Sequence, residues 1–226
     1  MINRGATLAT KKSYHHGDLR KKLLATALEI ISEHGLEKVS MRGLGHRIGV
    51  SRTAPYRHFA DKSALLCAIA EQGHQNLTTV LQDANQQFSD DPLTRLTNTG
   101  IGYVEFAVAN PVHYRIMFGN EILENNRTSE LVNAAETSFN ELLYAVRACQ
   151  EEKLIKPLNP YVIANTLWSL VHGISMLLID GQIQAANAFK GMPAMLQPGI
   201  EAGKVDVRRI FEYMSDILLT GLMADA

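Results

Sequence analysis

Apolar residues recur at helical spacing along most of the chain, and no segment shows the alternation that is typical of a β-strand. A first helix is expected over 18–35, because Asp18 can cap its start and Gly35 can end it. Further on, prolines that follow Asp or Asn mark where helices begin. The predicted helices of this second part cover residues 93–109, 111–118, 128–153, 160–180 and 204–223, with a connection over 181–203. The sequence therefore predicts an all-α fold.

Short helices separated by a glycine turn are predicted between the first helix and this second part. Ser40 can cap a helix that ends at Gly49, a residue suited to a sharp turn. Ser51 can cap the next helix, which is expected to reach about Phe59, and Asp61 can cap a fourth. Two short helices joined in this way are typical of a helix-turn-helix, the element that many proteins place in the DNA major groove.

The charge distribution supports a nucleic-acid partner for the N-terminal part. The whole chain has a net charge of -1, but residues 1–62 carry twelve Lys or Arg against five Asp or Glu. The first 17 residues are polar and basic without an apolar period, so they are expected to form a flexible arm. A basic segment joined to an acidic body suits a protein that presents one face to a polyanion.

The turn that opens the third predicted helix has the residues that a DNA-reading helix needs. Small and polar side chains let the backbone enter the major groove, where Arg52 can contact guanine and Thr53 can use its hydroxyl or methyl group. Each candidate alone has an alternative interpretation as a solvated charge or a packing residue. Taken together, the pattern favours double-stranded operator DNA as a partner. The candidate DNA-binding residues are Arg42, Ser51, Arg52, Thr53, Ala54, Tyr56, His58 and Lys62.

This segment resembles a known family. The run GVSRTAPYRHFADKSALL over 49–66, with Ser40-Met41-Arg42 before it, is similar to the signature of TetR-family transcriptional regulators. The opening YHHGDLR, residues 14–20, is similar to one branch of that family. The resemblance implies a three-helix helix-turn-helix domain joined to a larger helical domain that binds ligand and dimerises. It also implies a repressor that a small-molecule effector releases from operator DNA.

The resemblance assigns roles to single residues and has departures. It implies that Arg42 and the run 52–54 face bases, whereas Tyr56, His58 and Lys62 contact phosphates. Gly43 stands where an acidic residue is common, and Gly45 where alanine is usual, so the second helix is expected to be weaker by up to about 1 kcal/mol per glycine. Pro55 falls at the end of the third helix's first turn, where we expect it to be tolerated.

The larger part of the chain is expected to bind the effector. The predicted domains are an arm over 1–17, a helix-turn-helix domain over 18–75 and an effector-binding and dimerisation domain over 76–226. Residues 168–173, WSLVHG, resemble the Trp-His-Gly element of one class of TetR C-terminal domain. The pocket candidates are Tyr103, Phe106, Tyr114, Met117, Phe118, Phe139, Trp168, Ser169, His172 and Met176. The alternative, equally open, is that these residues form the core.

The last long helices predict a homodimer. The segment 160–180 is apolar nearly all round, which is more than the core of one subunit covers. A two-fold dimer also presents two reading helices to an inverted-repeat operator. The expected interface residues are Ile174, Leu178, Ile210, Met214, Ile217 and Leu218.

Other classes of function find little support. Cys67 and Cys149 lie in apolar surroundings without metal-ligand spacing, and no catalytic motif is found, so we expect no cofactor, no metal and no enzyme activity. The start of the chain lacks the apolar stretch of a signal peptide, and 161–179 contains polar residues that indicate a buried helix rather than a membrane span. A cytoplasmic protein is expected. The alternative function is a helical small-molecule-binding protein without DNA-binding activity of its own.

Overall fold

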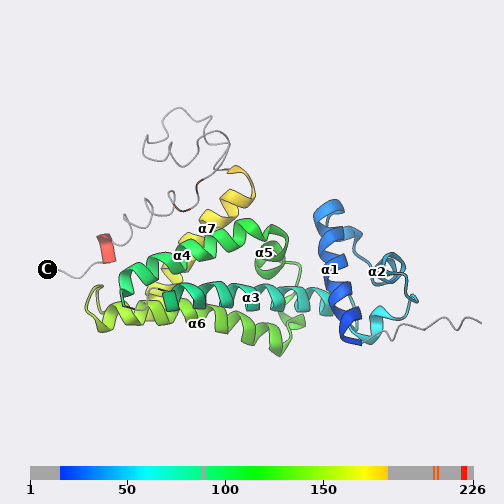
Figure 1. Ribbon diagram of the computed structural model, residues 1–226, viewed down its shortest axis with the longest axis horizontal. Coiled ribbons are helices and arrows are strands. Elements are labelled where there is room, and N and C mark those ends of the chain that lie inside the picture. The colour runs from blue at the N-terminus through cyan, green and yellow to red at the C-terminus, as the bar shows by residue number, and fades with distance from the viewer. Residues whose placement is uncertain (1–15, 88–89, 183–205, 207, 209–219, 223–226) are drawn as a thin grey trace, which may run out of the picture. The chain divides into compact units, whose positions relative to one another are not determined.

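A computed structural model describes residues 16–87, 90–182, 206, 208 and 220–222. They form helices joined by turns and short irregular segments, with no strand among them, as the sequence predicts (Figure 1). The predicted arm over 1–17, the connection over 181–203 and the helix over 204–223 lie largely or wholly outside the described residues. The chain divides into two compact units, Met1–Leu65 and Leu66–Ala226.

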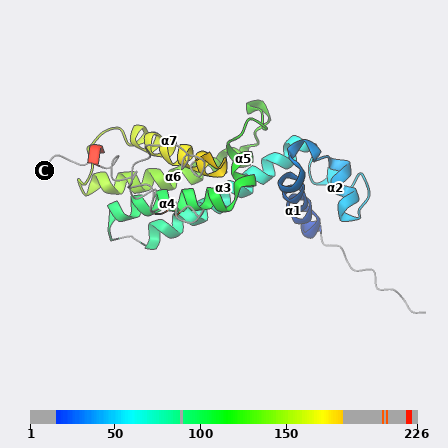
Figure 2. The same ribbon diagram turned by 90° about the horizontal axis from the view of Figure 1, so that it is seen from above.

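The first unit contains the first predicted helix and the beginning of the predicted helix-turn-helix. Helix α1 spans His16–His34, and α2 spans Met41–Ile48, followed by the turn (Figure 2). The Ser40 hydroxyl oxygen accepts the N–H of Gly43 at 3.1 Å and so caps α2. Gly49 has a φ of 78°, a conformation that favours glycine, and ends the helix. Both predicted signals are confirmed. A short 3₁₀-helix, η1, over Leu36–Lys38 joins the two helices.

The segment after the turn is shorter than predicted. Instead of an α-helix from Ser51 to about Phe59, the structure has a 3₁₀-helix, η2, over Pro55–Arg57. Proline has no N–H, so Pro55 cannot donate the first α-helical bond to the Ser51 carbonyl, which accepts from Ala54 N–H at 3.0 Å instead. The next two N–H groups also bond three residues back. The prediction of a full α-helix here was wrong.

The helices of the second unit begin where the sequence indicates. Helix α3, Lys62–Gln87, starts in the first unit, where the Asp61 carboxylate accepts the N–H of Ala64, and continues into the second. The other helices are α4 (Pro92–Ala109), α5 (Pro111–Phe118), α6 (Ser129–Glu151) and α7 (Pro160–Ile179), with a 3₁₀-helix, η3, over Glu124–Asn126. Three of them begin with the predicted proline.

The core of the second unit lies between α4, α6 and α7, which pack against one another (Figure 2). Its centre is a cluster of buried side chains that includes Leu96 of α4, Leu143 and Val146 of α6, and Ile163 of α7. Helix α3 joins this bundle through side chains that contact α4 and α6, such as the Asn85 amide, which donates to Glu141 of α6 at 2.9 Å. The bundle of the second unit therefore contains four long helices, α3, α4, α6 and α7.

Helix α7 has one buried and one exposed face. Ile174 and Leu178 are buried within the chain, with 3% and 6% of their surface exposed, so they are not available to a partner subunit and that prediction is corrected. The exposed apolar side chains of α7 are instead Tyr161, Val162 and Leu177. The other predicted interface residues, Ile210, Met214, Ile217 and Leu218, lie outside the described residues. Among those described, α7 is the one helix long and apolar enough to span a membrane, a test that core helices also pass.

Candidate functional site

The first candidate site is the exposed surface around the helix-turn-helix. Arg42 of α2 and Arg52 after the turn are exposed, and neither makes an ion pair or hydrogen bond to a described residue. Thr53 is also exposed, and its hydroxyl lies 3.3 Å from that of Ser51. Tyr56 is 46% exposed. These side chains are free to contact a ligand as large as DNA.

The remaining candidates are more constrained. Ala54 and His58 are half-buried. The Lys62 ammonium donates to the carbonyl of Leu36 at 2.7 Å, which holds the start of α3 against η1 within the first unit. Because an ammonium has three protons, Lys62 keeps donors for a phosphate while it makes this structural bond. Arg47, by contrast, is paired with Glu33 at 3.1 Å.

Gly45, one of the two glycines that depart from the family pattern, has a steric role. Gly45 is buried, and a Cβ atom there would lie 3.0 Å from the Ser51 carbonyl oxygen and 3.3 Å from a ring carbon of Pro55. An alanine would push the η2 segment away by a few tenths of an ångström. The glycine therefore lets the reading segment pack closely on α2, at the cost of local helix propensity.

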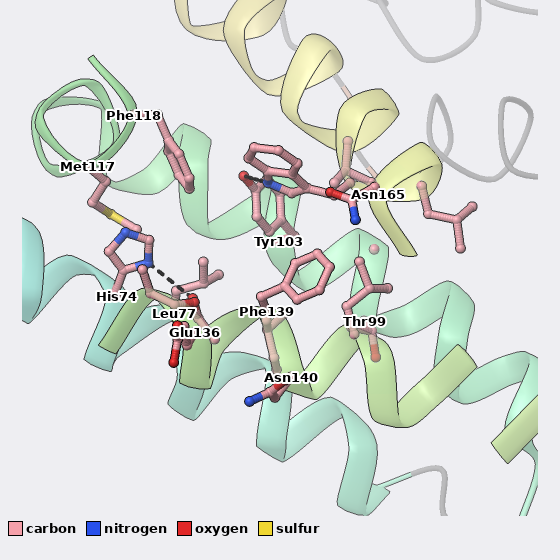
Figure 3. A pocket seen from close by; sticks show the side chains of 18 of the residues that line it. His74, Leu77, Thr99, Tyr103, Met117, Phe118, Glu136, Phe139, Asn140 and Asn165 are labelled. Carbon is pink, nitrogen blue, oxygen red and sulfur yellow. Dashed lines mark hydrogen bonds between the residues drawn. The ribbon is translucent and has the colours of Figure 1, made fainter. Parts of the chain in front are cut away.

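The second candidate site is a cavity of about 810 Å³ inside the second unit. Side chains from α3, α4, α5, α6 and α7 line it, and Figure 3 shows them pointing into a common space. A volume of this size accommodates a drug-sized ligand. Five of the predicted pocket residues lie in its wall: Tyr103, Met117, Phe118, Phe139 and Trp168.

The other five predicted residues are not in this wall. Phe106 and Tyr114 are buried in the surrounding core, and His172 and Met176 are half-buried on α7. Ser169 is exposed, and its hydroxyl donates to the carbonyl of Asn165 at 2.8 Å. The aromatic residues that the sequence singled out are therefore divided between the cavity wall and the core.

A hydrogen-bonded chain connects the cavity wall to this core. The Trp168 indole N–H donates to the Tyr103 hydroxyl at 3.1 Å, which lies 2.9 Å from the hydroxyl of Tyr114. The Tyr114 hydroxyl lies 2.7 Å from Nδ1 of His172. Burial raises the pKa of Tyr103 and that of Tyr114, the latter to about 12, and lowers the pKa of His172. All members of the chain are therefore uncharged at neutral pH.

The structure adds a buried histidine that the sequence reasoning missed. His74 of α3 lines the cavity, and its Nδ1 lies 3.0 Å from the hydroxyl of Ser138 on α6. Burial, and after it the charge of Arg127, lowers the pKa of His74 to about 4. Helical spacing carried a signal for this face, because His74, Leu77 and Leu81 are three and four residues apart and all line the cavity.

Polar wall residues were missed as well, since no motif marks them. They are Thr97, Thr99, Arg127, Glu136, Ser138, Asn140 and Asn165. The part of the chain that the structure describes contains no group of three metal-ligating side chains. Cys67 and Cys149 are buried and not joined in a disulfide, and burial raises the pKa of the Cys149 thiol to about 11.

These features define a helix-turn-helix protein with a ligand-sized cavity in a separate helical unit. Comparison with protein families gives two matches: residues 23–69 match the bacterial regulatory proteins of the tetR family, and residues 96–196 match the tetracyclin repressor-like C-terminal domain. Together these ranges span more than half of the chain. The chain belongs to the tetR family, whose members are DNA-binding transcriptional regulators.

Individual relatives agree with this assignment. The chain is 30% identical over 131 residues to the nucleoid occlusion factor SlmA of Pectobacterium carotovorum, covering 56% of this chain and 64% of that protein. It is 24% identical over 156 residues to the transcriptional regulator AcrR of Shigella flexneri, covering 66% and 72%. A solved structure of a protein of unknown function from Rhodococcus sp. RHA1 is 30% identical, with a TM-score of 0.75, and the match covers 94% of this chain and 100% of that one.

Proposed function

We propose that this chain is a dimeric repressor that binds operator DNA through its first unit and leaves the DNA when a small molecule fills the cavity of the second. The observation that carries the first half is the pair of exposed, unpaired arginines, Arg42 and Arg52, beside a helix-turn-helix turn. Arginine at such a position can contact guanine through two hydrogen bonds, and Tyr56, His58 and Lys62 would hold neighbouring phosphates.

The release step needs a ligand that favours a state with lower affinity for DNA. The cavity supports this proposal because His74 in its wall belongs to α3, the helix whose first residue, Lys62, is in the reading unit. Helix α3 begins in the first unit and continues into the second. A ligand that displaces His74 would therefore move the helix that connects the two units. Binding of ligand and release of DNA would then be one coupled equilibrium.

The dimer would form through the exposed face of α7 and the helix predicted over 204–223. Val162 and Leu177 on α7 are 60% and 48% exposed, so apolar surface of this helix is available to a partner. A two-fold axis there would place two reading segments for an inverted repeat. Within this proposal the second unit is of the Trp-His-Gly class, because Trp168 and His172 contact each other with ring centroids 5.6 Å apart.

The proposal places the protein in the cytoplasm with DNA and assigns it no catalytic reaction. The test is transcription in vitro from the promoter beside the strongest binding fragment of its own genome. Added protein should lower transcript yield, and a compound shown to bind the cavity should restore it. Unchanged or increased transcription from a bound promoter would overturn the repressor assignment.

A further inference from the structure

Three hydroxyl groups of the cavity wall, those of Thr97, Thr99 and Ser138, have protons that are already committed, whereas Tyr161, the other phenol at the wall besides Tyr103, is exposed. The hydroxyls of Thr97 and Thr99 each donate to the carbonyl four residues earlier, at 3.0 and 2.9 Å. The Ser138 hydroxyl donates to the carbonyl three residues earlier at 2.8 Å. A hydroxyl has one proton and two lone pairs, so these groups can offer a ligand only an acceptor.

The proton position on His74 follows from Ser138. Because the Ser138 proton goes to a backbone carbonyl, the 3.0 Å contact with His74 must use an N–H on Nδ1 of the imidazole. A neutral imidazole has one N–H, so Nε2 is an acceptor, and no described residue donates to it. The lowered pKa of His74, about 4, keeps the ring in this neutral form. His74 therefore presents an unused acceptor in the cavity wall (Figure 3).

Tyr103, like His74, presents a hydrogen-bond acceptor to the cavity. An indole N–H can only donate, so the Tyr103 oxygen accepts from Trp168. In the arrangement that gives each of these protons a partner, the Tyr103 proton goes to Tyr114 and the Tyr114 proton goes to Nδ1 of His172. What Tyr103 has left for the cavity is a lone pair, again an acceptor.

The charged groups of the wall lie at its exposed edge. Arg127 and Glu136 line the cavity but are both exposed to solvent. Between them and the core the wall is formed by neutral polar groups and by rings such as Phe118, Phe139 and Trp168. A charged group pushed among these rings would lose its hydration, while the cation of the wall, Arg127, stays hydrated at the exposed edge.

We propose that the effector is an uncharged, mainly aromatic or hydrocarbon molecule that carries hydroxyl donors, such as a phenol or an alcohol. This inference rests on the proposed effector-binding function and specifies its ligand. The hydroxyl would donate to Nε2 of His74 or to the Tyr103 oxygen, while the rings of the wall cover the rest of the molecule. A ligand that offers only acceptors would leave these lone pairs unmatched, a loss that binding sites penalise.

Three probes with two aromatic rings each test this class by calorimetric titration of the full-length protein. Bisphenol A has donors, its dimethyl ether has the same rings with acceptors only, and diphenylacetate adds a charge. We expect bisphenol A to bind at least about tenfold more tightly than either. If burial of apolar surface alone decides affinity, the more apolar dimethyl ether should bind more tightly than bisphenol A. Equal or tighter binding of the ether or the carboxylate, or no binding of bisphenol A, would overturn the proposal.

Paired variants locate the effect. His74→Leu should reduce the preference for bisphenol A over its ether, because the acceptor is lost while the apolar surface is kept. His113→Leu is the matched control, since His113 of α5 does not line the cavity and its change should leave the preference intact. Tyr103→Phe tests the second acceptor and keeps the proposal falsifiable if His74→Leu does not fold. A preference unchanged in both His74→Leu and Tyr103→Phe would contradict the assignment.

Different outcomes would contradict the proposed ligand class and the proposed function. If bisphenol A binds with the expected preference but leaves operator binding unchanged at saturation, the release mechanism is wrong and the ligand class stands. If the ether or the carboxylate binds best and also releases the operator, the function stands and the ligand class is wrong.

Discussion

Gly73 of α3 lies so close to Met117 of α5 that a Cβ atom on the glycine would come within 2.8 Å of the methionine Cγ. Met117 also lines the cavity. The backbone of α3 and the wall of the cavity are therefore in direct contact through one flexible side chain. A ligand that displaces Met117 would change this contact with α3.

This contact predicts the effect of Gly73→Ala. The added methyl group should destabilise the protein by about 1–3 kcal/mol through overpacking, although alanine favours a helix by up to about 1 kcal/mol. Urea unfolding at one fixed protein concentration measures the change. In a Met117→Ala background the same substitution should be neutral or stabilising. An equal loss in both backgrounds would show that Met117 is not the obstacle.

Acid should destabilise the protein through His74. Its pKa is lowered from 6.5 to about 4 in the folded state, so between these values the unfolded chain binds a proton that the folded chain does not. The free energy of unfolding is therefore unaffected by His74 above about pH 6.5 and falls as the pH drops towards 4, by up to about 3 kcal/mol. Urea unfolding at pH 7 and pH 4.5 should show a smaller loss for His74→Leu than for the wild type. The same loss in both proteins would refute this.

The helical elements could be predicted from sequence because their signals are local. The starts of α4, α5 and α7 at proline, the Ser40 cap and the Gly49 turn each depend on a few neighbouring residues. The η2 segment was missed for an equally local reason: Pro55 removes a donor that an α-helix needs at that point. There the prediction gave more weight to the capping signal of Ser51 than to the missing N–H of Pro55.

The cavity could be predicted only in part. Large aromatic side chains such as Tyr103 and Trp168 are candidates for a pocket wall, but the sequence does not show which of them face a cavity and which fill the core. Tyr114 and His172 belong to the core, bonded to the wall from behind. The pairing of His74 with Ser138 joins residues 64 positions apart, which no periodic pattern reveals.

The arginines near the turn should differ in their effect on DNA recognition. Arg52 is exposed and unpaired, so Arg52→Ala should lose about 1–3 kcal/mol of discrimination at one symmetric pair of operator positions. Arg47→Ala is the matched control, because Arg47 is held by Glu33 and should leave sequence preference unchanged. Selection of binding sites from random DNA compares the two. An unchanged motif for Arg52→Ala would remove that residue from base recognition.

Trp168 should report on the cavity, since it is the single tryptophan of the chain and lies in the wall. A bound ligand that does not absorb in the tryptophan range should change its emission. Ala135→Phe, which places a ring in the cavity wall, should weaken that response at least about tenfold by excluding the ligand. Thr137→Phe adds the same ring at an exposed position of α6 outside the wall and should leave the response intact. Equal responses in both variants would place the ligand elsewhere.

The most direct measurement is fluorescence anisotropy of labelled DNA from upstream of the protein's own gene, titrated with the full chain over a series of salt concentrations. Unrelated DNA of equal length serves as the comparison. We expect tighter binding to the upstream fragment, with an affinity that falls steeply with salt, because each neutralised phosphate adds roughly 0.9 to the logarithmic slope. Replacing Arg42 and Arg52 with alanine should abolish the difference between the two DNAs. Equal affinity of the unaltered protein for both fragments, or no binding at low salt, would contradict the assignment of this protein as an operator-binding regulator.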